Sequence, residues 1–276
     1  MKNLLLLSVA LILSVSCQKK DQVEELWIKN GERTLYGVLS RPADGAKKQP
    51  VLIVSHGFNG THHFGMNYFP LLNELGYQCF AFDFACGSVN SRSDNNTMEM
   101  SILDECSDLK AVVEHFRTQP DVDPDRIVLL GESQGGLVSA LVADEMSEEI
   151  SRLILIFPAL CIPDNWNKRY QTVEDIPDTT RLWDVPMGRR FFTEIRDLDV
   201  FTRMERFGKP VIIIQGDQDP VVSIDDSKRA IGLYDNASLH IIEGAGHGFK
   251  PDEFDESLEQ IKKFLLYNNE YSTYPQ

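Results

Sequence analysis

An apolar run that stops at a serine flanked by glycines most strongly limits the folds open to this chain. Residues 127–141 read IVLLGESQGGLVSAL, so a strand-like run ends at Gly131 and apolar residues with helical spacing follow Gly136. A strand that turns at once into a helix needs small residues where the two backbones pass, and the side chain at the apex then points outward. The stretch predicts a strand, a sharp turn and a helix, with Ser133 at the apex.

Short apolar runs rich in β-branched residues recur along the chain and alternate with helical patterns. Continuous runs of this kind are typical of strands buried on both faces of a parallel sheet. Asn30 and Gly31 lie between two further strand-like runs and predict an antiparallel hairpin. The expected fold is a doubly wound, mostly parallel α/β sheet that begins with this hairpin. The predicted strands cover residues 51–55, 77–84, 126–130, 152–157, 210–215 and 238–243.

Helical patterns fill most of the intervals between these runs. Ser223 and Asp226 predict a capping box at the start of one helix, and residues 254–268 predict a C-terminal helix. About fifty residues separate the strands at 152–157 and 210–215, far more than a simple crossover needs, so we expect an insertion there. Another helix is predicted with one apolar face formed by Ile102, Leu103, Cys106, Leu109, Val113 and Phe116.

The serine at the turn has partners for nucleophilic catalysis later in the chain. A serine hydroxyl is a weak nucleophile near neutral pH and needs a base, which in turn needs an orienting acid. Asp219 and His247 each follow a predicted strand, in IIIQGDQDPVVS and IIEGAGHGF, and loops at the carboxyl ends of strands meet at one edge of such a sheet. We predict Ser133 as nucleophile, His247 as base and Asp219 as acid. Asp217 is the rival acid, which we expect to cap or stiffen the turn.

An oxyanion hole needs backbone amides from two separate segments near the nucleophile. Gln134 follows the serine directly, and Phe58 lies in VSHGFNG after the strand at 51–55, so we expect their amides to be the donors. His56 is assigned to this substrate-binding loop as an anchor by hydrogen bond. With His62 and His63 it could suggest a metal site, but no carboxylate spacing supports one, so we predict no metal and no organic cofactor.

The N-terminal residues and the charge limit location and partners. MKNLLLLSVALILSVSC has a lysine, an apolar stretch too short to span a bilayer and small residues before Cys17. It resembles a bacterial lipoprotein signal, which implies lipidation of Cys17 at a bacterial envelope; ordinary cleavage to a periplasmic or secreted protein is the alternative. The formal net charge of −15 and pI near 4.8 argue against nucleic acid and an anionic membrane surface, so membrane contact is expected only through a lipid anchor.

Four further cysteines follow the signal-like segment. In an exported protein they could form disulfides, for which four thiols allow three pairings. Buried free thiols are the alternative, at least for Cys79, which lies inside an apolar run. The four are Cys79, Cys86, Cys106 and Cys161.

The motifs HGF, FDF, GESQGG, GDQDPVV and GAGHGF occur in this order over about residues 34–266. Together they resemble the α/β-hydrolase superfamily and, within it, the bacterial cinnamoyl (feruloyl) esterases. The resemblance implies a serine esterase that acts on a small ester, such as a plant-derived ester of ferulate, caffeate or p-coumarate. It also implies that the insertion, at about 160–207, is a lid over the nucleophile. The expected divisions are a signal peptide at 1–17, a tether at 18–25 and the hydrolase domain at 26–276.

Substrate contacts are expected from the lid. It is rich in aromatic residues, of which most are expected to bury its own small core. Trp166 and Tyr170 are assigned to the substrate site, and Asp164 is expected to accept a hydrogen bond from the ring hydroxyl of a hydroxycinnamoyl group. One departure from the family is Ala85-Cys86-Gly87, where the family often has glycine-histidine-glycine, and this loop borders the site.

Three functions remain open at this point. The preferred one is a carboxylesterase for hydroxycinnamoyl or short acyl esters. A prolyl-oligopeptidase-like exopeptidase uses the same triad, although such enzymes usually carry a large extra domain. A tethered binding protein with a hydrolase fold but no catalysis is the third. The oligomeric state is not predicted.

Overall fold

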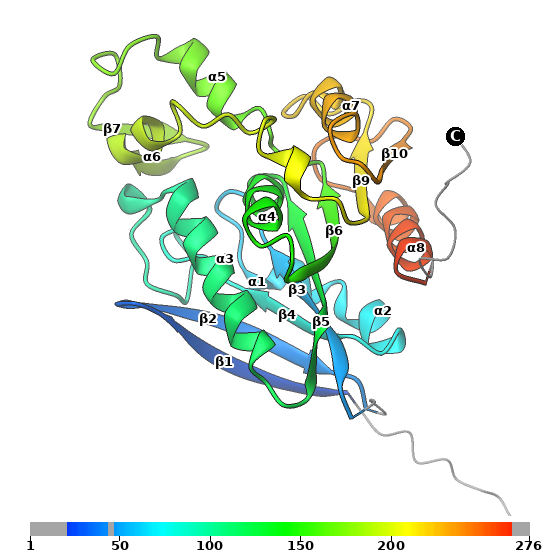
Figure 1. The fold of residues 1–276 in the computed structure, drawn as a ribbon. Coiled ribbons are helices and arrows are strands. Elements are labelled where there is room, and N and C mark those ends of the chain that lie inside the picture. The colour runs from blue at the N-terminus through cyan, green and yellow to red at the C-terminus, as the bar shows by residue number, and fades with distance from the viewer. Residues whose placement is uncertain (1–20, 44–46, 267–276) are drawn as a thin grey trace, which may run out of the picture.

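A sheet of eight strands organises the chain, in the order β1-β2-β4-β3-β5-β6-β9-β10 (Figure 1). The computed structural model describes residues 21–43 and 47–266, so the predicted signal peptide and Cys17 lie outside the described residues. β1 and β4 each pair antiparallel with β2, and the remaining pairs are parallel. The strands are β1 Gln22–Asn30, β2 Arg33–Arg41, β3 Gln49–Ser55, β4 Gln78–Phe82, β5 Val122–Glu132, β6 Ile150–Ile156, β9 Val211–Gly216 and β10 Ala237–Ile242.

The predicted sheet and its N-terminal hairpin are confirmed. Gly31 is the first of two loop residues between β1 and β2 and has a φ of 58°, which glycine adopts without a Cβ clash. β1 begins at Gln22, which pairs with Arg41 of β2. The second half of the predicted tether is therefore part of the sheet, where the polar residues occupy an exposed edge strand.

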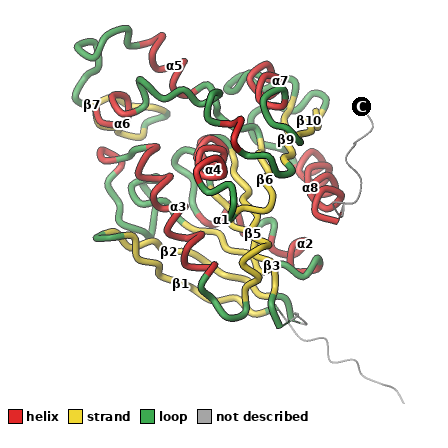
Figure 2. The backbone as a smooth tube through the Cα atoms, viewed as in Figure 1, coloured by secondary structure: helices red, strands yellow, loops and turns green. Residues whose placement is uncertain are grey.

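Helices cover both faces of the sheet, as Figure 2 shows. On one face α3 (Ile102–Arg117) and α4 (Gln134–Glu145) pack in one apolar core, and on the other face α1 (His62–Met66), α2 (Phe69–Glu74) and α8 (Pro251–Leu266) pack in a second. Successive strand residues alternate between the cores, since Leu129 belongs to the first and Leu130 to the second. The prediction for α3 is wrong at Leu103, which is 43% exposed on the outer side of the helix.

The remaining elements follow β6 and β9. α7 (Ile224–Ile231) begins after Ser223, whose hydroxyl accepts a hydrogen bond from the amide of Asp225 at 3.2 Å. The predicted insertion between β6 and β9 contains α5 (Ile162–Arg169), the hairpin of β7 (Thr179–Leu182) and β8 (Val185–Gly188), α6 (Arg189–Glu194) and a short 3₁₀ turn, Met204–Arg206. A second 3₁₀ turn, Thr97–Glu99, precedes α3. Among the residues that the structure describes, no helix is long and apolar enough to cross a bilayer.

The four cysteines of the described chain are free thiols. Cys79 and Cys106 are buried in the two apolar cores, and burial raises the pKa of both thiols. The alternative of buried free thiols is therefore the one that the structure supports.

Glycines allow the β5–α4 turn to sit against its neighbours. A Cβ on Gly131 would lie 2.3 Å from the carbonyl oxygen of Gly135, and a Cβ on Gly135 would lie 2.3 Å from the carbonyl oxygen of Ser55 at the end of β3. Both contacts are with backbone, which cannot rotate away. The small residues that were predicted at this crossing are therefore required by close approach.

Gly135→Ala should lower the free energy of unfolding by about 1 to 3 kcal/mol or more, because the added methyl group overlaps the β3 backbone. Denaturant unfolding followed by circular dichroism measures this loss. Gly232→Ala is the matched control, since its nearest contact would be at 3.4 Å. Equal unfolding midpoints for the two variants would show that the turn can relax around the methyl group.

Candidate active site

The apex of the β5–α4 turn holds Ser133 in a strained backbone conformation. Its φ and ψ are 51° and −116°, a region that non-glycine residues rarely occupy and that is often found at functional sites. The amide of Ser133 donates to the carbonyl oxygen of Ile156 at 3.0 Å, and its own carbonyl oxygen accepts from the amide of Ala159 at 2.8 Å. The end of β6 thus holds the turn in place.

The structure brings Ser133, His247 and Asp219 together from three loops. His247 Nε2 lies 3.1 Å from Ser133 Oγ, and His247 Nδ1 lies 2.8 Å from Asp219 Oδ2. Asp219 Oδ1 accepts hydrogen bonds from the amides of Val221 and Val222 at 2.8 and 2.9 Å. The Asp219 side chain is 1% exposed and that of His247 is 17% exposed, so the pair is shielded while the imidazole still reaches solvent.

Asp217, the rival acid, occupies a different position. Its Oδ1 accepts a hydrogen bond from the amide of Gly244 at 2.7 Å, and the residue is exposed. Gly244 has a φ of 75° in the loop after β10. Asp217 therefore braces one loop against the next, which is the role expected for it.

Two backbone amides beside Ser133 are free to bind an anion. Within the described chain, neither the amide of Phe58 nor that of Gln134 donates to another group. The Gln134 amide belongs to the first turn of α4, where helix amides have no partner in their own helix. A Cβ on Gly57 would lie 3.1 Å from Ser133 Cβ, so glycine lets the Phe58 loop approach the serine.

His56 fixes the peptide that carries the Phe58 amide. His56 Nε2 accepts from the amide of Phe84 at 3.1 Å, so the proton is on Nδ1, which donates to the carbonyl oxygen of Gly57 at 2.8 Å. That carbonyl is in the same peptide plane as the Phe58 N–H and points away from it. Burial lowers the pKa of His56, which favours this neutral form. His56 is an anchor of the loop rather than a contact to substrate.

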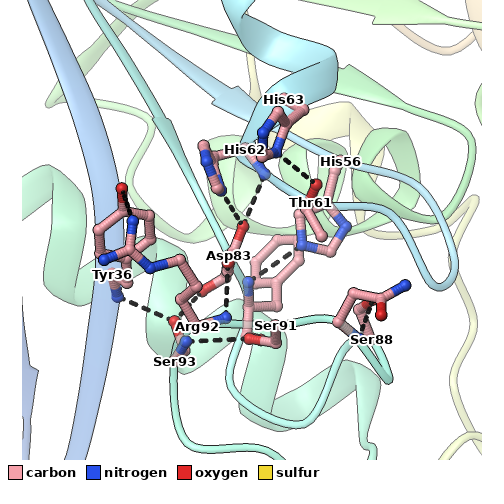
Figure 3. A network of polar contacts seen from close by, with 12 residues as sticks. Tyr36, His56, Thr61, His62, His63, Asp83, Ser88, Ser91, Arg92 and Ser93 are labelled. Carbon is pink, nitrogen blue, oxygen red and sulfur yellow. Dashed lines mark hydrogen bonds and ion pairs between the residues drawn. The ribbon is translucent and has the colours of Figure 1, made fainter. Parts of the chain in front are cut away.

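A buried carboxylate, Asp83, ties the start of α1 to the loop that carries Arg92 (Figure 3). Asp83 Oδ1 accepts from the amide and Nδ1 of His62 at 2.6 and 2.8 Å, and Oδ2 accepts from the amide of Arg92 at 2.8 Å. The nearby His63 Nδ1 lies 3.3 Å from the Thr61 hydroxyl. The three histidines thus bind protein groups, and the described residues contain no cluster suited to a metal ion.

The loop after β4, where the sequence departs from the family pattern, also supports the Phe58 segment. The amide of Asn59 donates to the carbonyl oxygen of Gly87 at 3.1 Å, and the amide of Val89 donates to Asn59 Oδ1 at 2.9 Å. Cys86 has a φ of 61°, a conformation that bends the chain toward Asn59. The segment Ala85-Cys86-Gly87 therefore supports the Phe58 loop through its backbone.

Glu105 of α3 holds the side chain that follows the serine. Gln134 Nε2 donates to both carboxylate oxygens of Glu105, at 2.8 and 2.9 Å. Burial raises the pKa of Glu105 to about 8, against the weaker lowering effect of the Gln134 hydrogen bond. The buried carboxyl group positions α4 at its first residue.

The predicted lid residues pack within the insertion or line a cavity that no member of the triad lines. Trp166 and Tyr170 stack at 6.0 Å between centroids and contact the buried Phe192, so they form part of the insertion's own core. Asp164 lines a cavity of about 360 Å³ with Asn167 and residues 196–201, and no member of the triad lines it. The predicted contact of Asp164 with an acyl ring has no support from this placement.

Sequence reasoning missed Asp83, Asn59 and Glu105, which hold the loops around Ser133. The FDF motif contains Asp83, but a single motif carboxylate gives no sign of its partners. Glu105 lies next to Cys106 on the apolar face of α3, and a charged residue at the border of such a face was the one available signal.

The raised pKa of Glu105 predicts how stability changes with pH. The unfolded carboxyl ionises near 4.5 and the folded one near 8, so the unfolded state releases a proton between these values and gains stability relative to the folded state. This group makes the free energy of unfolding fall by roughly 1.4 kcal/mol per pH unit from pH 5 to 8. Glu105→Gln should remove that contribution in denaturant titrations at several pH values, whereas Glu114→Gln, on the exposed side of α3, should keep the wild-type slope. A wild-type slope in Glu105→Gln would contradict the assignment.

Comparisons with solved structures agree with this fold. The chain is similar to Est1E from Butyrivibrio proteoclasticus, in a structure with bound ferulic acid. The two chains are 26% identical with a TM-score of 0.80, and the match covers 87% of this chain and 98% of that chain. The structure of DcsB with a substrate analogue is 18% identical with a TM-score of 0.71, covering 89% of this chain and 98% of that one, which shows the fold alone.

Two curated relatives match parts of the chain. An uncharacterized protein from Mycobacterium tuberculosis is 24% identical over 223 residues, which is 78% of this chain and 69% of that protein. The quorum-quenching protein AidA from Acinetobacter baumannii is 28% identical over 88 residues, and the match covers 32% of this chain and 28% of that protein.

The family described as serine aminopeptidase, S33, matches residues 46–183, which is half of the chain and includes Ser133 with the loop at Phe58. The sheet order and the strained serine turn are those of an α/β hydrolase. The similar solved structures are esterase-like. The chain therefore belongs to this α/β-hydrolase family.

Proposed function

We propose that this protein is a serine carboxylesterase that cleaves hydroxycinnamoyl or short acyl esters through an acyl-enzyme. The observation that carries the proposal is the chain of hydrogen bonds from Ser133 through His247 to Asp219, beside the two free amides of Phe58 and Gln134. A bound ester carbonyl at this position would meet a nucleophile, a base and oxyanion donors at once.

In this mechanism Ser133 Oγ attacks the ester carbonyl carbon while His247 Nε2 takes the hydroxyl proton. The carbonyl oxygen becomes an oxyanion that the amides of Phe58 and Gln134 bind. His247 then gives its proton to the leaving alkoxide as the C–O bond breaks. Water repeats the sequence on the acyl-enzyme, and Asp219 keeps the imidazole in the required tautomer throughout.

Two observations support this substrate class. Est1E, which is 26% identical to this chain, has a structure with bound ferulic acid. The other observation is the position of Trp183. Trp183 is at the tip of the β7–β8 hairpin, is 64% exposed and has a φ of 46°. Its ring lies 5.8 Å from that of Phe58, at an interplanar angle of 65°. An exposed aromatic ring in a strained turn beside the oxyanion loop is suited to stack on a planar acyl group.

An aminopeptidase is the second candidate, because the matching family carries that description. It needs the same triad and also a partner for the α-ammonium group of its substrate. Activity on methyl ferulate, p-nitrophenyl acetate and aminoacyl anilides separates the two, since an esterase leaves the anilides intact. Labelling of Ser133 by a fluorophosphonate separates both from a binding protein without catalysis.

Ser133→Ala or His247→Ala should each lower ester turnover by roughly a million-fold, because the triad acts as a unit. Asp219→Asn should cost on the order of ten thousand-fold in kcat. Asp217→Asn, in the same loop, is the matched control and should affect mainly stability through Gly244. The measurement is the rate of methyl ferulate hydrolysis with circular dichroism as a check of folding. A tenth of the activity remaining in Ser133→Ala would exclude the serine mechanism.

Trp183→Ala should raise KM for methyl ferulate about 3- to 10-fold, the range of one aromatic contact, while hydrolysis of p-nitrophenyl acetate changes little. Trp27→Ala is the control, because Trp27 is 54% exposed in β1 and contacts Tyr36 instead of the oxyanion loop. Equal loss on both esters in Trp183→Ala would assign the residue to loop support rather than to recognition of the acyl group.

A further inference from the structure

A second cavity, of about 520 Å³, lies on the α1–α8 side of the triad and has no assigned role. Its inner wall includes Tyr68, Glu132 and Phe157, and its rim includes the exposed Asn67 and Asp255. Ser133, Asp219 and His247 are not among the lining residues. Phe157 separates the cavity from the triad, since its ring lies 4.8 Å from that of His247. The cavity is thus adjacent to the site at Ser133 but distinct from it.

Two polar groups in this cavity have no partner among the described residues. Tyr68 is fully buried, and its hydroxyl forms no hydrogen bond. Glu132 has neither a hydrogen bond nor an ion pair within the described chain, and burial raises its pKa to about 8 without any opposing cation. Burial and, to a smaller extent, the charge of Glu132 raise the pKa of the Tyr68 hydroxyl. Buried polar groups are normally satisfied, so the Tyr68 hydroxyl indicates a missing partner, and the half-buried carboxyl of Glu132 lines the same cavity.

Four further lining residues, Phe64, Phe157, Phe249 and Phe254, are aromatic. Tyr68 lies 5.5 Å from Phe64 and 5.2 Å from Phe254, and Phe157 lies 4.9 Å from Phe249, all between ring centroids. The lining contains no lysine or arginine. Rings of this kind attract alkylated ammonium groups by their faces, and a carboxylate adds the opposite charge. The formal net charge of −15 favours the approach of a cation.

We propose that this cavity binds a small organic cation of the quaternary ammonium class, with its charge next to Glu132 and its methyl groups against the aromatic rings. A hydroxyl on the cation would pair with Tyr68. This proposal concerns a site separate from Ser133 and holds whether or not the protein is an esterase.

Choline and its uncharged isostere 3,3-dimethylbutan-1-ol test the charge. Both are titrated by calorimetry into the full chain carrying Ser133→Ala, which prevents turnover, in phosphate or borate buffer free of organic cations. We expect choline to bind at least about tenfold more tightly than the isostere. Excess methyl ferulate should leave choline bound. Equal affinity for choline and the isostere, displacement by methyl ferulate or no binding of choline would each overturn the proposal.

Variants in the same background test the residues. Glu132→Gln should weaken choline binding at least about tenfold, and Tyr68→Phe should weaken it less. Glu132→Gln removes a half-buried carboxyl that has no partner among the described residues, and it should fold at least as well as the parent. Asp252→Asn is the control, since Asp252 is an exposed carboxylate in the first turn of α8 outside the cavity. Unchanged affinity in Glu132→Gln would overturn the proposal.

The pH dependence gives an independent signature. Choline requires ionised Glu132, so affinity should rise about tenfold per pH unit from pH 6 to 8 and level off above. Tyr68, Asp255 at the rim and His247 behind Phe157 are the other titratable groups that face Glu132. If Glu132 is the group that titrates, choline affinity no longer depends on pH in Glu132→Gln. A pH dependence that persists in that variant would assign the effect to one of the other groups and contradict the proposal.

Discussion

The close approach of three backbones at Ser133 is the constraint on which the rest of the site depends. The β5–α4 turn passes the end of β3 at Gly135 and the segment after β6 at Gly136, whose added Cβ would lie 2.9 Å from Pro158. With side chains there, the turn would move outward and the serine would lose its neighbours. The strain at Ser133 is tolerated because contacts on both sides hold the turn.

Buried carboxyl groups then place the loops around this turn. Asp83 binds the start of α1 and the loop at Arg92, while Glu105 binds the first side chain of α4. Each carboxyl joins elements that are distant in the sequence. Glu132 differs from both because it forms no hydrogen bond or ion pair with the described residues.

The sequence predicted the sheet, the hairpin and the convergence of Ser133, Asp219 and His247, since strand patterns and strand-end loops leave few arrangements. It also predicted that Asp217 braces a turn and that His56 anchors its loop, although His56 was assigned to substrate binding as well, and its hydrogen bonds to Gly57 and Phe84 do not support that assignment. It could not place Asp164, because residues 158–210 follow no repeating pattern that fixes which side faces Ser133. The hairpin tip at Trp183 was equally hidden, since its approach to Phe58 depends on how the insertion packs.

The topology of the sheet has a consequence for how activity arises during folding. Ser133 and His247 are 114 residues apart in the chain. Ser133 follows β5, which pairs with β6, and His247 follows β10, which pairs with β9, so the pairing of β6 with β9 joins the two parts of the sheet that carry them. Local helices can form early, but these long-range contacts form only when the loop entropy between them has been overcome. The Ser133–His247 contact therefore requires the assembled sheet, which makes it a marker of the whole domain rather than of any fragment.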